Sequence, residues 1–228
     1  MRSLAIITAA ALLCAAGSQA AAPARKAAAP AARDWTRTVT ATPEGGFRLG
    51  NPAAPVKLVE FGSLTCSHCA AFSAESKAGL PSYIRSGRVS FEFRNMVLNA
   101  ADVSASLLAR CAGPRGFFQM VDRVYATQPD WLGKVAAQSE AYASLPDTQK
   151  FVRIAEIGGL TGIAAQSGVA PARARACLVD KAGLNRLVQM YQAANALGVQ
   201  RTPTFLINGR KSDAHEWASL EPLLKQGG

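Results

Sequence analysis

Apolar and polar positions between residues 56 and 93 follow the pattern of two strands separated by a helix. Residues 56–61 form an almost continuous apolar run, which is typical of a central strand that is covered on both faces. Residues 88–93 alternate apolar and polar side chains with the period of two that indicates a strand. Between them, a helix is expected from residue 66 toward residue 80, with Pro81 kinking or ending it. This stretch therefore predicts a βαβ unit.

The rest of the chain changes from helical character back to strands. Residues 100–197 lose the β pattern, and the helical segments expected there are 104–111, 117–125, 134–142, 150–157, 171–178 and 183–197. Residues 202–209 then return to strand character, and Asn208-Gly209 is a strong hairpin signal. The remaining elements are a first strand at 36–40, a short segment between turns at 47–49 and a last helix at 215–224. The order is therefore βαβ, a helical insertion, then ββα.

The first 20 residues have the parts of a secretory signal peptide. A charged start precedes an apolar stretch at 4–16 that is short for a bilayer span. Ser18 and Ala20 are small residues of the kind that a signal peptidase reads, so we expect cleavage near Ala20. Residues 21–34 are rich in Ala and Pro and predict a flexible linker. The chain is therefore expected to be exported.

The charge of the chain is strongly basic. There are 25 Lys and Arg against 15 Asp and Glu, which gives a formal net charge of +10. Such a balance can indicate nucleic acid or an anionic membrane surface as a partner. The basic residues are scattered, however, and no basic run alternates with aromatic residues. We expect no nucleic-acid partner and interpret the charge as a solvated surface with some attraction to phospholipid.

The motif Cys66-Ser67-His68-Cys69 lies where the predicted strand hands over to the predicted helix. A helix N-terminus and a Cys-x-x-Cys arrangement both stabilise thiolate, which is the reactive form of cysteine. His68, when protonated, would add a positive charge beside Cys66. Structural zinc would need two further ligands at a compatible spacing, and the other Cys and His residues do not supply them. The motif predicts a thiol–disulfide exchange centre that needs no metal and no cofactor.

The remaining cysteines allow a second bond. Removal of the signal peptide takes Cys14 away and leaves four cysteines, an even number for an oxidising compartment. If Cys66 and Cys69 form one pair, Cys111 and Cys177 are expected to form a structural disulfide. The alternative is two buried free thiols, because unpaired cysteine behaves as a small hydrophobic residue.

Three features of the chain occur together in one known family. They are Glu60-Phe61 followed by the Cys66–Cys69 motif, the helical insertion, and the segment 198–209. In this combination the chain resembles the DsbA family, thioredoxin-fold oxidoreductases of the bacterial periplasm. The resemblance covers roughly residues 50–226 and implies an α/β protein, a thioredoxin fold with an inserted α-helical domain. The expected parts are a signal peptide at 1–20, a linker at 21–34, the first half of the fold at 35–99, the insertion at 100–197 and the second half at 198–228.

The resemblance also implies roles for individual residues. Cys66 would be the exposed nucleophile that forms the mixed disulfide with the substrate, and Cys69 the shielded resolving thiol. Ser67 and His68 occupy the dipeptide that sets redox character; strong oxidants of the family often carry Pro-His, so Ser67 departs from that pattern. Thr202-Pro203 resembles the cis-proline loop, which faces the disulfide and pairs with an extended substrate in β fashion. We therefore expect Ser67 and Thr202-Pro203 to contact substrate.

Glu60 lies within the apolar strand, six residues before Cys66. Thioredoxin-like proteins often hold a buried acid at this spacing, where it accepts or relays the proton of the resolving cysteine. Burial would raise the pKa of Glu60 toward neutrality, which suits a general base. The alternative is a surface acid paired with Lys57 or Arg94.

The leading hypothesis is a periplasmic, monomeric dithiol oxidase that donates its disulfide to folding exported proteins. By resemblance, a membrane quinone-linked partner would reoxidise it. The nearest alternative is an isomerase or reductase that uses the same residues. Less favoured alternatives are a Cu(I)-binding protein that uses Cys66, His68 and Cys69 as ligands, and a peptide-binding chaperone with inert cysteines. Trp131, in a loop-like stretch at 128–131, could belong to a peptide-binding rim.

Overall fold

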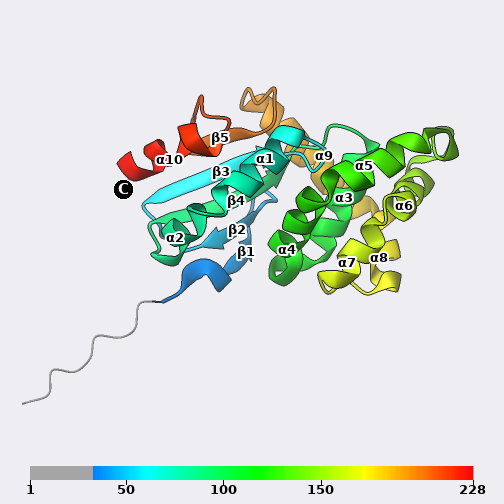
Figure 1. Cartoon of the computed structure of the whole chain (residues 1–228), viewed down its shortest axis with the longest axis horizontal. Coiled ribbons are helices and arrows are strands. Elements are labelled where there is room, and N and C mark those ends of the chain that lie inside the picture. The colour runs from blue at the N-terminus through cyan, green and yellow to red at the C-terminus, as the bar shows by residue number, and fades with distance from the viewer. Residues whose placement is uncertain (1–32, 228) are drawn as a thin grey trace, which may run out of the picture. The chain divides into compact units, whose positions relative to one another are not determined.

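The computed structural model describes residues 33–227, which form a six-stranded sheet together with helices on both of its faces (Figure 1). The predicted signal peptide lies outside the described residues, as does the predicted linker except for its last two residues. The strands are β1 (Val39–Ala41), β2 (Phe47–Gly50), β3 (Val56–Gly62), β4 (Val89–Asn95), β5 (Thr204–Ile207) and β6 (Arg210–Lys211). The helices are α1 (Ser67–Ser76), α2 (Leu80–Arg85), α3 (Ala100–Cys111), α4 (Gly113–Ala126), α5 (Gln128–Ala137), α6 (Asp147–Ile157), α7 (Leu160–Gln166), α8 (Pro171–Leu178), α9 (Lys181–Ala196) and α10 (Trp217–Gln226). Across the sheet the order is β1-β2-β4-β3-β5-β6, which confirms the expected α/β class.

Strand β3 is the central strand on which the site is built. It pairs in parallel with β4 and antiparallel with β5, so both of its edges are hydrogen-bonded. Leu58 faces the large core that includes α1, whereas Val59 and Phe61 face a second core with Ala194 of α9. Because side chains alternate along a strand, Glu60 lies on the face of Leu58 and points toward α1. Helices on both faces explain why this strand is apolar along its whole length.

The segment predicted as one helix from residue 66 toward 80 is two helices. Helix α1 ends at Ser76 and α2 begins at Leu80. The prediction that Pro81 ends the helix is wrong about the place, because Pro81 lies in the first turn of α2, where its missing N–H costs nothing. Gly79 precedes α2, and a Cβ at this position would lie 2.5 Å from the Trp217 ring of α10. The break therefore coincides with a close approach of the C-terminal helix.

Helices α3–α9 form the helical insertion, and Figure 1 shows α3–α8 gathered beside one end of the sheet. Phe117 of α4 is fully buried and stacks on Phe47 of β2, with ring centroids 4.2 Å apart. Cys111 of α3 and Cys177 of α8 form a disulfide with an S–S distance of 2.02 Å, the pairing that the cysteine count favours over free thiols. The insertion is thus packed on the sheet by aromatic contacts and closed internally by a covalent bond.

Three expectations for shorter elements need correction. Residues 36–40 are not one strand: Trp35–Arg37 form a 3-10 turn, because the Asp34 carboxylate accepts a hydrogen bond from the Thr36 N–H. The helix expected at 134–142 ends earlier, with α5 stopping at Ala137. Trp131 belongs to α5 and is 1 % exposed, so its assignment to a loop with a binding rim is wrong. Helix α7 is an element that the sequence pattern did not predict.

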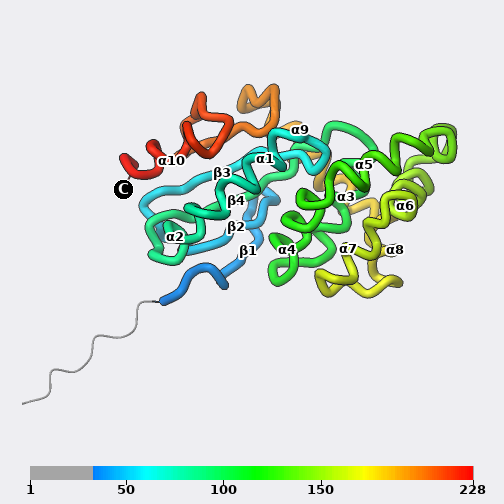
Figure 2. The backbone as a smooth tube through the Cα atoms, viewed as in Figure 1, coloured from blue at the N-terminus to red at the C-terminus, as the bar shows by residue number. Residues whose placement is uncertain are grey.

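The hairpin at Asn208-Gly209 is confirmed. Strands β5 and β6 pair antiparallel, and the two turn residues have φ angles of 49° and 82°, the positive values that Asn and Gly tolerate best. The Asn208 side chain accepts a hydrogen bond of 2.8 Å from the Lys57 N–H, which ties the hairpin to β3. Figure 2 shows the chain before β5, in orange, returning beside the start of α1, in cyan. Within residues 33–227, none of the helices combines the length and apolar character that a bilayer crossing requires.

Candidate active site

Cys66 and Cys69 lie at the N-terminal end of α1, directly after the loop that follows β3. Cys66 is the N-cap residue, and its N–H donates to the Ser63 carbonyl at 3.2 Å. Its side chain is half-buried, whereas Cys69, one turn further on, is 0 % exposed, and neither is disulfide-bonded in this structure. A substrate sulfur can therefore reach Cys66 and not Cys69, as their predicted roles require.

The surroundings of Cys66 favour its charged form. Its pKa falls to about 5, first because the Cys69 thiol hydrogen-bonds to it, and then because the Thr202 side chain does the same. The backbone N–H groups of Cys69 and His68 add to this effect, and partial burial opposes it. The donors converge because the helix end leaves these N–H groups without partners inside α1. Cys66 is thus a thiolate at neutral pH.

Cys69 has the opposite character. Burial raises its pKa well above the usual value, and the hydrogen bond to Cys66 raises it further. The charge that Glu60 carries once it ionises and the charge of the Cys66 thiolate act in the same direction. Cys69 therefore keeps its proton when the two cysteines are reduced. The reduced pair then consists of a Cys66 thiolate beside a protonated Cys69 thiol.

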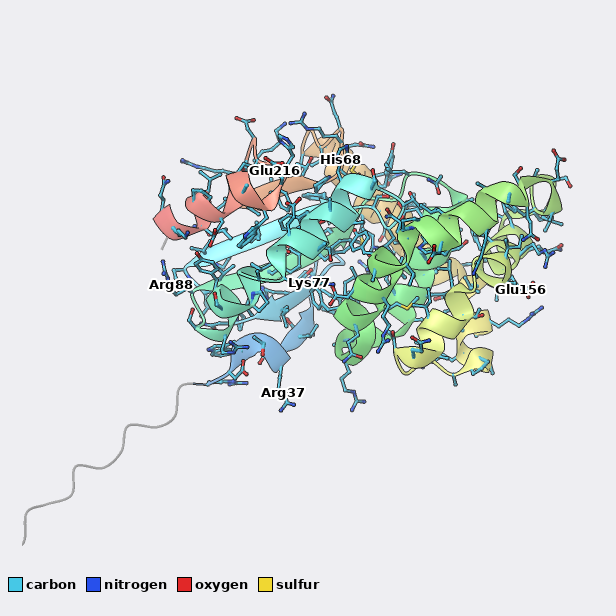
Figure 3. All side chains as sticks on the ribbon, viewed as in Figure 1. Arg37, His68, Lys77, Arg88, Glu156 and Glu216 are labelled. Atoms are coloured by element: carbon cyan, nitrogen blue, oxygen red, sulfur yellow. A yellow bond between two sulfur atoms is a disulfide. The ribbon has the colours of Figure 1, made fainter. Side chains whose placement is uncertain are left out.

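Ser67 and His68 are both exposed between the two cysteines. Figure 3 shows His68 at the start of α1 and Lys77 at the other end of that helix. In this structure residue 68 stabilises the Cys66 thiolate through its backbone N–H, which any residue except proline would supply. Within residues 33–227, no three His, Cys, Asp or Glu side chains are grouped in a way that could hold a metal ion.

The Thr202-Pro203 loop contacts the pair across a long sequence separation. The peptide bond between these two residues is cis. The Cys66 sulfur lies 3.2 Å from the Thr202 carbonyl, to which its protonated form donates a hydrogen bond, so the loop lies directly against the nucleophile. Pro203 itself is buried, and Thr202 is partly exposed beside it. An extended peptide lying along this loop would meet the Cys66 sulfur.

Glu60 is a buried acid and not a surface residue. It is 2 % exposed, and its Oε1 has no hydrogen-bond partner among the described residues. Arg94, the proposed partner in the surface alternative, instead pairs with Glu92 at 2.7 Å. Burial raises the pKa of Glu60 to about 8, and the Cys66 charge contributes to the same shift. Glu60 also lines a cavity of about 250 Å³ whose other walls are mainly apolar.

Three polar side chains near the site were not singled out by the sequence. Asp102, Tyr125 and Gln128 belong to α3, α4 and α5, and all of them hydrogen-bond to the loop between β3 and α1. The only signal for Asp102 is its position three residues after Asn99, which caps α3; that spacing is common at helix starts. Nothing in the local pattern indicates that these three residues meet one loop.

Comparison with known proteins agrees with this geometry. The Thioredoxin family model matches residues 42–226. The crystal structure of a protein-disulfide isomerase from Novosphingobium aromaticivorans is 31 % identical, covers 79 % of this chain and 96 % of its own, and gives a TM-score of 0.73. Alpha-DsbA1 of Wolbachia pipientis, at 24 % identity, covers 78 % of this chain and 88 % of its own with a TM-score of 0.64 and shows the same fold.

A curated relative is longer than the region that it shares with this chain. A provisionally named protein-disulfide oxidoreductase of Rickettsia bellii is 27 % identical over 187 residues, which is 79 % of this chain and 64 % of the relative. The chain therefore spans a little under two thirds of that relative's length. The thioredoxin match covers most of the chain, and the Novosphingobium structure is matched over nearly its whole length. The chain therefore belongs to the thioredoxin family.

Proposed function

We propose that the protein is a periplasmic dithiol oxidase that passes its Cys66–Cys69 disulfide to cysteines of folding exported proteins. The observation that carries this proposal is the contrast between the two thiols: the pKa of Cys66 is about 5, and that of Cys69 lies well above its usual value. A stabilised Cys66 thiolate stabilises the reduced pair, and a stable reduced form makes the disulfide a stronger oxidant. The names of the Novosphingobium and Rickettsia relatives support the reaction class.

The first step forms a mixed disulfide. A substrate thiolate attacks the Cys66 sulfur of the oxidised pair, and the Cys66–Cys69 bond breaks with its electron pair going to Cys69. Because Cys69 is buried and its pKa is high, the new thiolate takes up a proton. Glu60, whose pKa of about 8 keeps it protonated at pH 7, can supply this proton and recover it from water that enters the adjoining cavity.

The second step releases the product. A second substrate thiolate attacks the substrate sulfur of the mixed disulfide, and Cys66 leaves as the thiolate that its surroundings stabilise. Two substrate thiols become one disulfide, and the pair accepts two electrons. One proton remains on Cys69 and the other passes to water. Thr202, whose carbonyl lies 3.2 Å from the Cys66 sulfur, is placed to align the substrate backbone during both attacks.

The proposed cell biology follows from the same chemistry. A disulfide donor needs an oxidising compartment and an oxidant that restores it, so we place the protein in the periplasm with a membrane quinone-linked partner. Fusion of residues 1–34 to a reporter that is active only after export tests the location. Light scattering tests the proposed monomer.

The decisive experiment is the equilibrium reduction potential of the Cys66–Cys69 pair in glutathione buffers. Alkylation followed by mass spectrometry of the peptide that contains this pair excludes interference from the second disulfide. We expect a value near that of a strong oxidant, about −120 mV. A value near that of thioredoxin, about −270 mV, would overturn the oxidase and indicate a reductase.

A second assay separates oxidation from isomerisation. The oxidised protein should restore activity to reduced ribonuclease faster than the reduced protein restores activity to ribonuclease with scrambled disulfides. Recovery that is faster with the scrambled substrate would favour an isomerase, the activity for which the Novosphingobium relative is named.

A further inference from the structure

The loop that carries Cys66 is held by the helical insertion and not by the sheet. Ser63 and the Leu64 N–H both donate hydrogen bonds to the carboxylate of Asp102, the latter at 3.0 Å. The same carboxylate accepts the Leu98 N–H at 3.1 Å and the Ser106 hydroxyl at 3.2 Å. Four donors from three segments of the chain thus converge on one side chain, which is 0 % exposed.

The carbonyl groups of this loop are held by two more side chains of the insertion. The Tyr125 hydroxyl donates to the Ser63 carbonyl at 3.1 Å. The Gln128 amide donates to the Leu64 carbonyl at 2.9 Å and to the Cys66 carbonyl at 3.1 Å. Both Tyr125 and Gln128 are buried. The donors and acceptors of the loop are therefore bound from α3, α4 and α5.

A purely structural clamp would not need a buried charge. Placing a carboxylate out of water costs several kcal/mol unless hydrogen bonds replace its hydration. At Asp102 this replacement is incomplete, since burial still raises its pKa to about 6 despite the hydrogen bonds from Ser63, Leu64 and Leu98. In return, the carboxylate supplies the acceptors that hold the Ser63 hydroxyl and the Leu64 N–H in the loop before Cys66.

The loop and the sulfur are connected by a short chain of contacts. The Cys66 N–H binds the Ser63 carbonyl, the group that Tyr125 also binds, so Ser63 fixes where the N-cap residue begins. A small shift of Ser63 would turn the Cys66 sulfur away from the backbone N–H groups at the start of α1. Those groups stabilise the thiolate only when they point at the sulfur.

We propose that Asp102, Tyr125 and Gln128 are positioning residues through which the helical insertion sets the reactivity of Cys66. Asp102 and Gln128 contact neither reacting sulfur and act through the loop at 63–66. Tyr125 binds the same loop and also hydrogen-bonds to the Cys69 sulfur. The inference rests on the dithiol chemistry of the proposed function but not on the direction in which that chemistry runs.

The test compares Asp102→Asn with Ser106→Ala. Asp102→Asn keeps the shape of the side chain and replaces one acceptor oxygen with a donor that faces the loop. Ser106→Ala removes a hydrogen bond to the same carboxylate from its own helix and leaves the loop contacts in place. Thiolate absorbance at 240 nm, measured against pH, gives the pKa of Cys66. Equilibration with glutathione gives the stability of the Cys66–Cys69 disulfide relative to the reduced pair.

We expect Asp102→Asn to raise the Cys66 pKa by about one unit and to shift the glutathione equilibrium about tenfold toward the disulfide. Ser106→Ala should stay within about twofold of the wild type. Ser63→Ala, Tyr125→Phe and Gln128→Met should shift both readouts in the direction of Asp102→Asn. The double variant Ser63→Ala/Asp102→Asn should shift the Cys66 pKa no further than the stronger of the two single variants. Both changes disturb the same hydrogen bond between Ser63 and Asp102, so their effects should not add.

Thermal unfolding of every variant separates positioning from stability. Variants that unfold at lower temperature while the Cys66 titration matches the wild type would overturn the proposal. If Asp102→Asn does not fold, Ser63→Ala and Gln128→Met decide by the same criterion, because both change only contacts of the loop. A wild-type protein without a low Cys66 pKa would instead count against the proposed function, so the two failures are distinguishable.

Discussion

The two cysteine pairs of this protein lie at opposite ends of helices. Cys66 is the N-cap of α1, whereas Cys111 is the last residue of α3 and Cys177 the last but one of α8. A helix N-terminus carries partial positive charge and free N–H groups, and a C-terminus carries partial negative charge and free carbonyls. Thiolate is therefore favoured at Cys66, whereas the helix ends at Cys111 and Cys177 offer a sulfur no free N–H groups. In thiol–disulfide exchange the attacking and leaving groups are thiolates. The position of a cysteine on its helix therefore distinguishes the reactive pair from the structural one.

Replacing the cysteines of the reactive pair should have the largest effect. Cys66→Ser should lower dithiol oxidation by on the order of a thousandfold or more, because no nucleophile remains at the helix end. Cys69→Ser should instead accumulate a mixed disulfide with substrate, since the resolving thiol is missing. Non-reducing gel electrophoresis with a substrate protein that contains a disulfide shows both results, because the Cys66 thiolate attacks that disulfide and stays bonded to one of its sulfurs. A mixed disulfide that forms with Cys66→Ser would contradict the assignment.

Removal of the structural pair should change stability and leave the reactive pair intact. Cys111 and Cys177 are separated by 66 residues, and a loop of this size is worth roughly 4 kcal/mol in the chain-entropy account of disulfides. We expect Cys111→Ala/Cys177→Ala to lose most of that in urea unfolding. The alkylation rate of Cys66 at pH 6 should stay within about twofold. A large change in this rate would show that the two pairs are coupled.

The buried acid offers a pH-dependent test. The pKa of Glu60 is about 8 in the folded protein and 4.5 as its ordinary value. The folded state therefore binds a proton that the unfolded state has lost between these limits, and the free energy of unfolding falls as pH rises from 4.5 toward 8.

Glu60→Gln removes this penalty. The variant should be more stable than the wild type at pH 8 by roughly 3 kcal/mol, with a smaller difference at pH 5. Urea unfolding of the oxidised proteins measures the part of this penalty that burial causes, because the Cys66 charge that also raises the Glu60 pKa is then absent. If the difference in free energy of unfolding between variant and wild type does not change with pH, the Glu60 pKa is not raised by folding. The carboxyl group would then be in contact with water.

The smallest effect is expected at His68. Because residue 68 acts on Cys66 through its backbone N–H, His68→Ala should change the alkylation rate at pH 6 by less than about threefold. Thr202→Ala provides the comparison, because it removes a side chain that hydrogen-bonds the thiolate and should slow the reaction more. If His68→Ala lowers the alkylation rate more than Thr202→Ala does, the His68 imidazole stabilises the Cys66 thiolate, as the sequence suggests.

Local patterns predict the elements that bear the cysteine motif. The apolar run of β3, the alternation of β4 and the Asn208-Gly209 turn are signals carried by neighbouring residues, and each leads to the observed element. The sequence also predicts the helical insertion as a class of structure. It places the end of the first helix wrongly because Pro81 serves equally well to begin α2.

Groups that meet across the fold were harder to predict. Asp102 looks like an ordinary acid in the first turn of a helix, which is favourable in any protein. Its importance comes from Ser63 and Leu64, which lie 39 and 38 residues earlier in the chain. Trp131 follows Pro129 and reads as a loop, but its indole N–H donates to the Val124 carbonyl inside the insertion. In both cases the role of the residue depends on tertiary contacts, which the local pattern of apolar and polar residues does not indicate.

The N-cap of α1 has a consequence for the motion of that helix. No side-chain oxygen caps α1, so the Cys66 sulfur serves its first free amides. In the disulfide this sulfur is uncharged and a poorer acceptor, whereas in the reduced pair it is a thiolate. Each cycle of oxidation and reduction would thus loosen and tighten the first turn. Amide hydrogen exchange at His68 and Cys69 should slow on reduction, so the helix end would report the redox state of the pair.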